Sequence, residues 1–158
     1  MKIAGILAND IIDGDDGVTV SLWVQGCHFH CDGCHNKHAW DFNGGTERDK
    51  DDVISEIKKL IVADGIRRNF SVLGGEPLCD ENVENVKYVI SKIREEFPDI
   101  RILVWTGYTF EELNNSQKEV LPLIDVLIDG RFKKELHKPD LKLRGSTNQR
   151  ILSKGIDF

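Results

Sequence analysis

A chain of 158 residues is long enough for one domain with a substantial core, and we expect residues 1–158 to form a single domain. Hydrophobic residues make up 40% of the chain and charged residues 30%, proportions that are typical of a soluble globular protein. No apolar run approaches the roughly 20 residues of a membrane-spanning helix, and the N-terminal stretch turns acidic too early for a secretory signal. These features predict a cytoplasmic protein without a membrane partner, whose cysteines stay reduced.

The net charge of −6 is unevenly distributed along the chain. Residues 131–158 carry eight Lys and Arg against three Asp and Glu, so this C-terminal segment is basic and the remainder is acidic. An acidic domain is a poor candidate for nucleic-acid binding. The basic segment 131–158 is either a solvated surface or a docking surface for a partner or an anionic ligand.

Strands and helices are predicted to alternate along the chain. In order, they are a strand over 18–25, a helix over 51–63, a strand over 70–73, a helix over 80–97, a strand over 100–105, a short helix opened by a capping box at 109–112, and a strand over 125–129. The first strand alternates with period two, which places Val20, Leu22 and Val24 on one face. Strands separated by helices indicate right-handed crossovers and a parallel sheet.

Glycine-bearing polar segments follow each predicted strand, at 25–26, 74–77, 106–108 and 129–130. The carboxyl ends of parallel strands share one edge of a sheet or barrel, and active sites form there. We expect about five or six strands, too few for an eight-stranded barrel of about 250 residues. The predicted fold class is therefore α/β, with an incomplete, open parallel β/α barrel.

Cys27, Cys31 and Cys34 lie within eight residues, directly after the first predicted strand, with the spacing C-x3-C-x2-C. Three thiolates can hold three irons of a [4Fe–4S] cluster and leave the fourth iron without a protein ligand. An open iron is a place where a small molecule can bind and react.

Two other interpretations of the cysteines remain open. Structural zinc sites use four ligands, and His28, His30, His35 or His38 lies close enough in sequence to complete a Cys3His set. Cys79 is a possible fourth cluster ligand, which would make the protein an electron carrier. Alternatively, Cys79 is a free thiol at the start of the 80–97 helix.

Gly74-Gly75-Glu76-Pro77 directly follows a predicted strand, at the same edge of the sheet as the cysteines. Glycines allow a ligand to approach the backbone closely, and a carboxylate can accept hydrogen bonds from an ammonium group. A pair of glycines alone is a common turn, but its combination with the three cysteines is specific.

With these motifs the chain resembles the radical S-adenosylmethionine superfamily, in which C-x3-C-x2-C binds the cluster and a GGE(P) segment holds the amino group of S-adenosylmethionine. Within it, the chain is most similar to the activating proteins of anaerobic ribonucleoside-triphosphate reductases. The matching segments are 26–36, 74–78, 105–108, 128–130 and 144–150. The resemblance implies an open barrel of the radical S-adenosylmethionine type, and an enzyme that cleaves S-adenosylmethionine reductively and abstracts hydrogen from a glycine of the reductase, leaving a glycyl radical.

The resemblance also implies roles for residues and partners. Cys27, Cys31 and Cys34 would ligate the cluster, and the cofactor would bind at Gly33, Cys34 and His35, at Gly74, Gly75 and Glu76, and at Asp129. Asp129 would accept hydrogen bonds from ribose hydroxyls, although an aspartate before a glycine is also a common turn. A reduced flavodoxin-type protein would donate the electron.

One position departs from the superfamily pattern, because Gly33 stands where an aromatic residue usually precedes the third cysteine. Backbone around Gly33–His35, with the His35 ring, would then have to hold the adenine. The rival functions are activation of another glycyl-radical enzyme of the formate-lyase type and a non-catalytic Cys3His zinc module.

Overall fold

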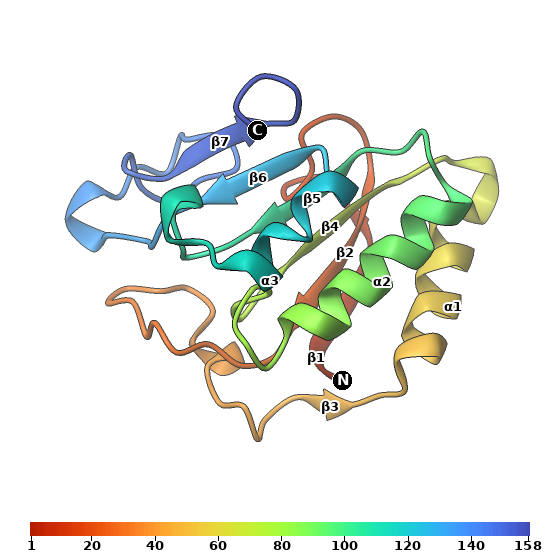
Figure 1. The fold of residues 1–158 in the computed structure, drawn as a ribbon, viewed down its shortest axis with the longest axis horizontal. Coiled ribbons are helices and arrows are strands. Elements are labelled where there is room, and N and C mark those ends of the chain that lie inside the picture. The colour runs from red at the N-terminus through yellow and green to blue at the C-terminus, as the bar shows by residue number, and fades with distance from the viewer.

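The computed structural model describes all of residues 1–158 (Figure 1). The strands are β1 (Lys2–Asp10), β2 (Thr19–Val24), β3 (Thr46–Glu47), β4 (Asn69–Gly74), β5 (Ile102–Trp105), β6 (Val126–Asp129) and β7 (Arg150–Ser153). The α-helices are α1 (Lys50–Ile61), α2 (Val83–Glu96) and α3 (Asn115–Lys118). Every predicted strand and both long helices are present. The capping box at Thr109 also forms, and it opens a 3-10 helix over Phe110–Glu112.

The strands form one mixed sheet in the order β3-β1-β2-β4-β5-β6-β7, and the sheet does not close into a barrel. Only β2, β4, β5 and β6 are mutually parallel, as the crossovers predict. β1 pairs antiparallel with β2, β3 with β1, and β7 with β6. The predicted count of five or six strands was therefore wrong, and so was a wholly parallel sheet, because the outer strands are antiparallel additions to the crossover core.

Helices α1 and α2 pack against one face of the sheet (Figure 1). The side chain of Asp49 caps α1 by accepting hydrogen bonds from the backbone N–H groups of Asp51 and Asp52. The apolar sides of both helices meet alternate residues of the central strands, among them Val20, Leu22 and Val24 of β2, in a cluster of 24 buried residues. The predicted face of the first strand is thus the helix-covered one.

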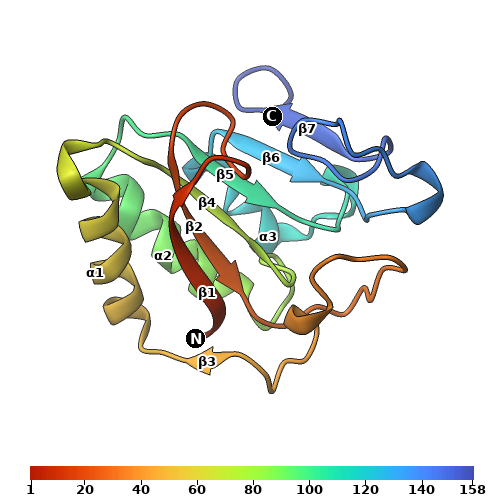
Figure 2. The ribbon, with the colours of Figure 1, turned by 180° about the vertical axis from the view of Figure 1, so that it is seen from behind.

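The opposite face of the sheet carries no helix (Figure 2). Alternation places Ser21 and Trp23 of β2 on this open face, together with Ser71 and Leu73 of β4. The segment after β6 and the loop after β1 come from opposite sides of the sheet. They meet at the open face, where Lys142 forms an ion pair with Asp15 at 2.8 Å. Part of the basic segment 131–158 is therefore built into the fold.

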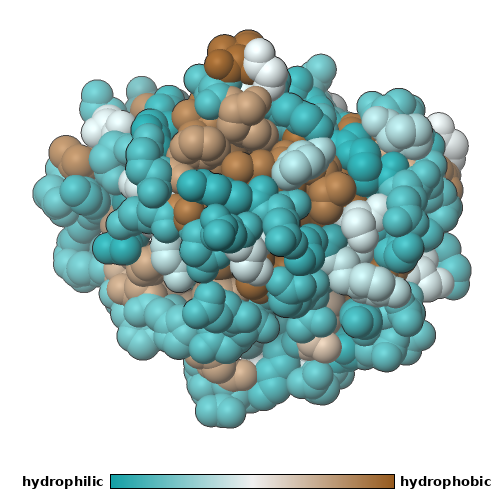
Figure 3. Space-filling view, viewed as in Figure 1, coloured by the Kyte–Doolittle hydropathy of each residue, from teal (hydrophilic) through white to brown (hydrophobic).

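The helix-bearing surface is mainly hydrophilic, with hydrophobic residues gathered in its upper half (Figure 3). No helix combines the length and the apolar composition needed to span a membrane.

Candidate active site

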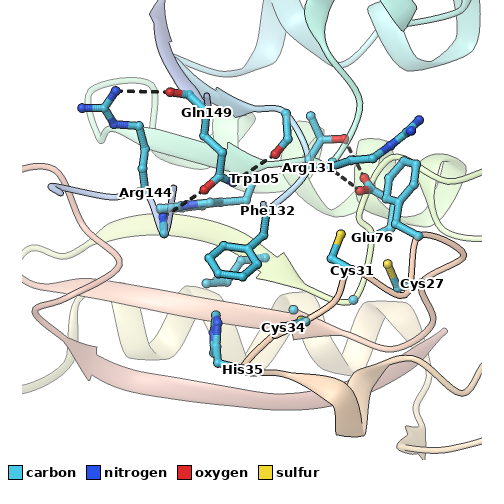
Figure 4. A pocket seen from close by; sticks show the side chains of 18 of the residues that line it. Cys27, Cys31, Cys34, His35, Glu76, Trp105, Arg131, Phe132, Arg144 and Gln149 are labelled. Atoms are coloured by element: carbon cyan, nitrogen blue, oxygen red, sulfur yellow. Dashed lines mark hydrogen bonds between the residues drawn. The ribbon is translucent and has the colours of Figure 1, made fainter. Parts of the chain in front are cut away.

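The carboxyl ends of the four parallel strands open into one cavity of about 450 Å³ on the open face (Figure 4). Its lining at this end comes from the cysteine loop and from the segments after β4, β5 and β6: Cys27, Cys31, Cys34, His35, Gly74, Gly75, Glu76, Thr106, Gly107, Gly130, Arg131 and Phe132. The sheet edge at which the strand ends were predicted to meet therefore carries a cavity, and its size is usual for small-molecule sites. It contains all but two of the expected site residues, Gly33 and Asp129.

The cysteine loop and the Gly74–Pro77 loop touch through their backbones. The N–H of Gly75 donates to the carbonyl of Val24 at 2.9 Å, and the N–H of Glu76 donates to the carbonyl of Gly26 at 2.7 Å. A Cβ atom on Gly75 would lie 2.2 Å from the Gly26 oxygen. Residue 75 has to be glycine because any side chain would push the two loops apart.

The first cysteine is anchored by the chain that follows the cysteine loop. Gly26 N–H donates to Ala39 O at 2.8 Å, and Cys27 N–H donates to Trp40 O at 3.1 Å. Burial raises the pKa of the Cys27 thiol to about 11, and burial together with Cys34 raises that of Cys31. Without metal these two thiols stay protonated at neutral pH, so metal binding has to release their protons.

Glu76 is almost completely buried at the head of the cavity. Its carboxylate accepts hydrogen bonds from the Gly107 N–H at 2.7 Å, the Thr106 hydroxyl at 2.7 Å and the Leu78 N–H at 2.9 Å. Burial outweighs these bonds and raises the pKa of Glu76 to about 7. A cationic group in the cavity would therefore meet a fixed carboxylate that ionises readily in its presence.

The histidines of the cysteine loop have different surroundings from one another. His28 pairs with Glu81 at 2.8 Å, His30 stacks on Trp40 with ring centroids 4.6 Å apart, and only His35 lines the cavity. No three His, Cys, Asp or Glu side chains in the chain converge as a single metal ion requires. The structure therefore offers no assembled Cys3His set, whereas cluster ligands are spaced around several irons.

Cys79 is buried outside the cavity lining, in the turn before α2. Its carbonyl accepts the Val83 N–H at 2.9 Å, within the first turn that leads into the helix. Burial raises the pKa of its thiol to about 12. This is the environment of a free structural thiol, which was one of the two interpretations of Cys79.

Gly33 has a φ of +77°, in the left-handed region that favours glycine. A Cβ atom there would lie 3.3 Å from the Phe132 ring and from the Lys134 side chain. In the same way, Arg131 lies over the Phe29 ring at 4.4 Å. The segment after β6 thus packs on the cysteine loop and brings the Phe132 ring beside Gly33. Neither Arg131 nor Phe132 was predicted as a site residue, although both lie directly after a predicted strand end.

Asp129 does not line the cavity. It is fully buried, and its carboxylate accepts hydrogen bonds from Arg150 Nε at 2.9 Å and from the Phe110 N–H at 2.7 Å. The reason is strand alternation. Val126 and Ile128 of β6 pack together on the open face, so Leu127 and Asp129 point the other way. The expected contact with ribose therefore has no geometric support.

Comparison with known proteins agrees with this geometry. A family model described as a 4Fe-4S single cluster domain matches residues 12–152. The anaerobic ribonucleoside-triphosphate reductase-activating protein of Vibrio cholerae is 39% identical over 145 residues, which cover 90% of this chain and 91% of the relative. The proteins of the same name are 40% identical over 143 residues in Escherichia coli K12 (89% of this chain, 90% of the relative) and 36% identical over 148 residues in Enterobacteria phage T4 (91% and 88%). The chain therefore belongs to the family of anaerobic ribonucleoside-triphosphate reductase-activating proteins, which carry a 4Fe–4S single cluster domain.

Proposed function

We propose that this protein activates an anaerobic ribonucleoside-triphosphate reductase by using S-adenosylmethionine at a [4Fe–4S] cluster held by Cys27, Cys31 and Cys34. The observation that carries the proposal is the backbone contact between the cysteine loop and the Gly74–Pro77 loop at the head of one cavity. When bound, the cluster supplies the electron that cleaves S-adenosylmethionine, so that a deoxyadenosyl radical can take a hydrogen atom from a glycine of the reductase.

The residues of the chain bind and orient the cofactor in this proposal. Glu76 accepts hydrogen bonds from the methionine ammonium group, and Gly74 and Gly75 allow that group to approach the backbone. Gly33, Cys34 and His35 lie against the adenosyl end, where the Phe132 ring beside Gly33 supplies the aromatic surface that residue 33 lacks. Groups other than Asp129 bind the ribose hydroxyls.

The remaining expectations belong to the same proposal. The open sheet serves as an incomplete barrel of the radical S-adenosylmethionine type, and the chain acts as one domain. It works in the cytoplasm, and a reduced flavodoxin-type protein supplies the electron.

Anaerobic reconstitution with iron and sulfide tests the proposal, followed by addition of a reductant and S-adenosylmethionine. We expect a brown protein that produces 5′-deoxyadenosine, and a glycyl radical signal in electron paramagnetic resonance once the reductase is added. Absence of 5′-deoxyadenosine contradicts the cofactor assignment. If the signal forms instead in a glycyl-radical enzyme of the formate-lyase type, the partner assignment is wrong.

A further inference from the structure

Three of the most exposed large hydrophobic side chains of the molecule lie within six residues of one another. Leu7 is 49% exposed, Ile11 74% and Ile12 78%. They occupy the second half of β1 and the turn that follows it. Clustered apolar exposure of this kind marks an interaction site more often than an isolated exposed residue does.

The turn that presents Ile11 and Ile12 is held in place by a buried aspartate. Asp10 is only 3% exposed, and its Oδ1 accepts hydrogen bonds from the Ile12 N–H at 2.8 Å and the Asp13 N–H at 3.0 Å. Its Oδ2 accepts the Ser21 hydroxyl at 2.7 Å. The two isoleucines are therefore fixed outside the core, so a partner would not have to order the turn.

The outer edge of β1 is also unpaired along most of its length. β3 pairs only with Lys2 and Ile3, so Ala4–Asn9 have a strand neighbour on the β2 side alone (Figure 2). The run Ala4–Ala8 contains no charged residue and no proline, which are the usual protections of an edge strand. A free edge of this kind is suited to pairing with an extended segment of another protein.

This surface is continuous with the reaction cavity. Ile12 is both exposed and part of the cavity lining. On β1 itself, Leu7 stands opposite Ser21, and Gly5 stands opposite Trp23, another lining residue. The side chain of Leu7 is therefore on the open face. A chain lying along β1 would come to the side of the cavity that Ile12 and Trp23 line.

We propose that the edge of β1 (Ala4–Asn9) and the Ile11–Ile12 turn form a docking surface for an extended, uncharged segment of the reductase. This inference rests on the proposed function, since only a substrate protein has to bring a glycine into the cavity. A second copy of this chain has no such requirement, and the continuity with the cavity therefore favours the reductase as the occupant.

The double variant Leu7→Asp/Ile11→Asp tests the docking surface, because it places two charges on this surface outside the cavity lining. Its matched control is Val62→Asp/Ile156→Asp, at positions that are 49% and 85% exposed elsewhere on the molecule. The reconstituted proteins are compared in two assays: formation of 5′-deoxyadenosine without the reductase, and glycyl radical yield as the reductase is titrated. We expect unchanged 5′-deoxyadenosine in all proteins. The reductase concentration for half-maximal radical yield should rise at least tenfold in the Leu7→Asp/Ile11→Asp variant only.

An unchanged titration curve in that variant overturns the docking surface. Loss of self-association in the variant, measured by light scattering, together with the shifted curve would assign the surface to a second copy instead. If the double variant does not fold, Ile11→Asp alone carries the test, since Ile11 lies in the turn rather than in the strand. Lack of 5′-deoxyadenosine in the unmodified protein would count against the proposed function and not against the docking surface.

Discussion

The two faces of the central sheet use the same strands for different purposes. On the helix-covered face, Val20, Leu22 and Val72 are fully buried in the aliphatic cluster beneath α1 and α2. On the open face, the intervening Ser21 and Ser71 carry hydroxyl groups that bond to Asp10 and to the Asp13 carbonyl. The helix-covered face therefore holds the larger apolar cluster, whose burial contributes most to the free energy of folding. The other holds polar groups and a cavity that is free to bind a ligand.

The largest expected effect concerns the cysteines, because substitutions at the cavity and away from it should differ most in their effect on the cluster. Cys31→Ser should lose nearly all iron after anaerobic reconstitution, because it removes one of the three proposed cluster ligands. Cys79→Ala, in the turn before α2, should keep iron and sulfide at the level of the unmodified protein. Iron and sulfide analysis with absorption spectra measures both. Loss of the cluster in the Cys79 variant would mean that Cys79 is a fourth ligand.

Gly75→Ala should disturb the contact between the two loops at the cavity head. The new Cβ would lie 2.2 Å from Gly26 O and 2.9 Å from Ala39 O. Both are backbone atoms, so relieving the overlap requires a shift of the main chain. We expect a loss of unfolding free energy on the order of 3 kcal/mol and poor cluster loading. Gly5→Ala is the control, since nothing lies within 4 Å of its Cβ position. Equal stability and loading of the two variants would show that the loops do not need this contact.

A variant in the core should instead lose stability while it keeps the geometry of the cavity. Ile57 of α1 is fully buried, so Ile57→Ala should lower the free energy of unfolding by about 2–5 kcal/mol. Leu7→Ala, on the half-exposed edge of the open face, should change it by less than about 0.5 kcal/mol. Urea denaturation of both cluster-free proteins gives these values. Similar losses in the two variants would contradict the division between the faces.

The last expected effect is a pH dependence of stability that arises from Glu76. Its folded pKa of about 7 lies above the value of roughly 4.3 for an unfolded glutamate, so the folded protein binds this proton more tightly. The resulting stability is fully present below about pH 4.3 and is lost as the pH rises through 7. The full loss is about 4 kcal/mol in the cluster-free protein, of which about 2–3 kcal/mol falls between pH 5 and pH 7.5.

Glu76→Gln should remove this part of the pH dependence. Asp13, whose pKa burial and the charge of Asp10 raise to about 6, contributes in the same direction. It is present in both proteins, so the difference between their stability curves isolates Glu76. Denaturation at pH 5 and pH 7.5 is sufficient for the comparison, and parallel curves would contradict the assignment.

The sequence predicted the crossover core well, because its strands and helices have clear periodicity. It did not predict β1, since register shifts between Ile3 and Gly5 and between Leu7 and Asp10 interrupt the alternation of apolar residues. β7 was missed for another reason. Arg150–Ser153 is a short run in a basic segment and becomes a strand through its pairing with β6.

Prediction of the site was limited in the same way, to features that are visible along the chain. The cysteines and Glu76 were predicted to lie together because they follow parallel strands, and position along a strand is visible in the sequence. The face on which Asp129 lies depends on register, which a four-residue strand hardly specifies. The contact of Phe132 with Gly33 joins segments about 100 residues apart, and no local pattern encodes such a contact.

The hydrogen bonds that Gly75 and Glu76 donate to Val24 and Gly26 continue the β2–β4 pairing beyond the last residues of both strands. The two loops that would hold the metal cluster and the ammonium group therefore share one backbone frame. The spacing between the two binding positions is then set by peptide geometry rather than by side-chain packing. The side chains of His28 and His30, between the cysteines, consequently take no part in setting that spacing.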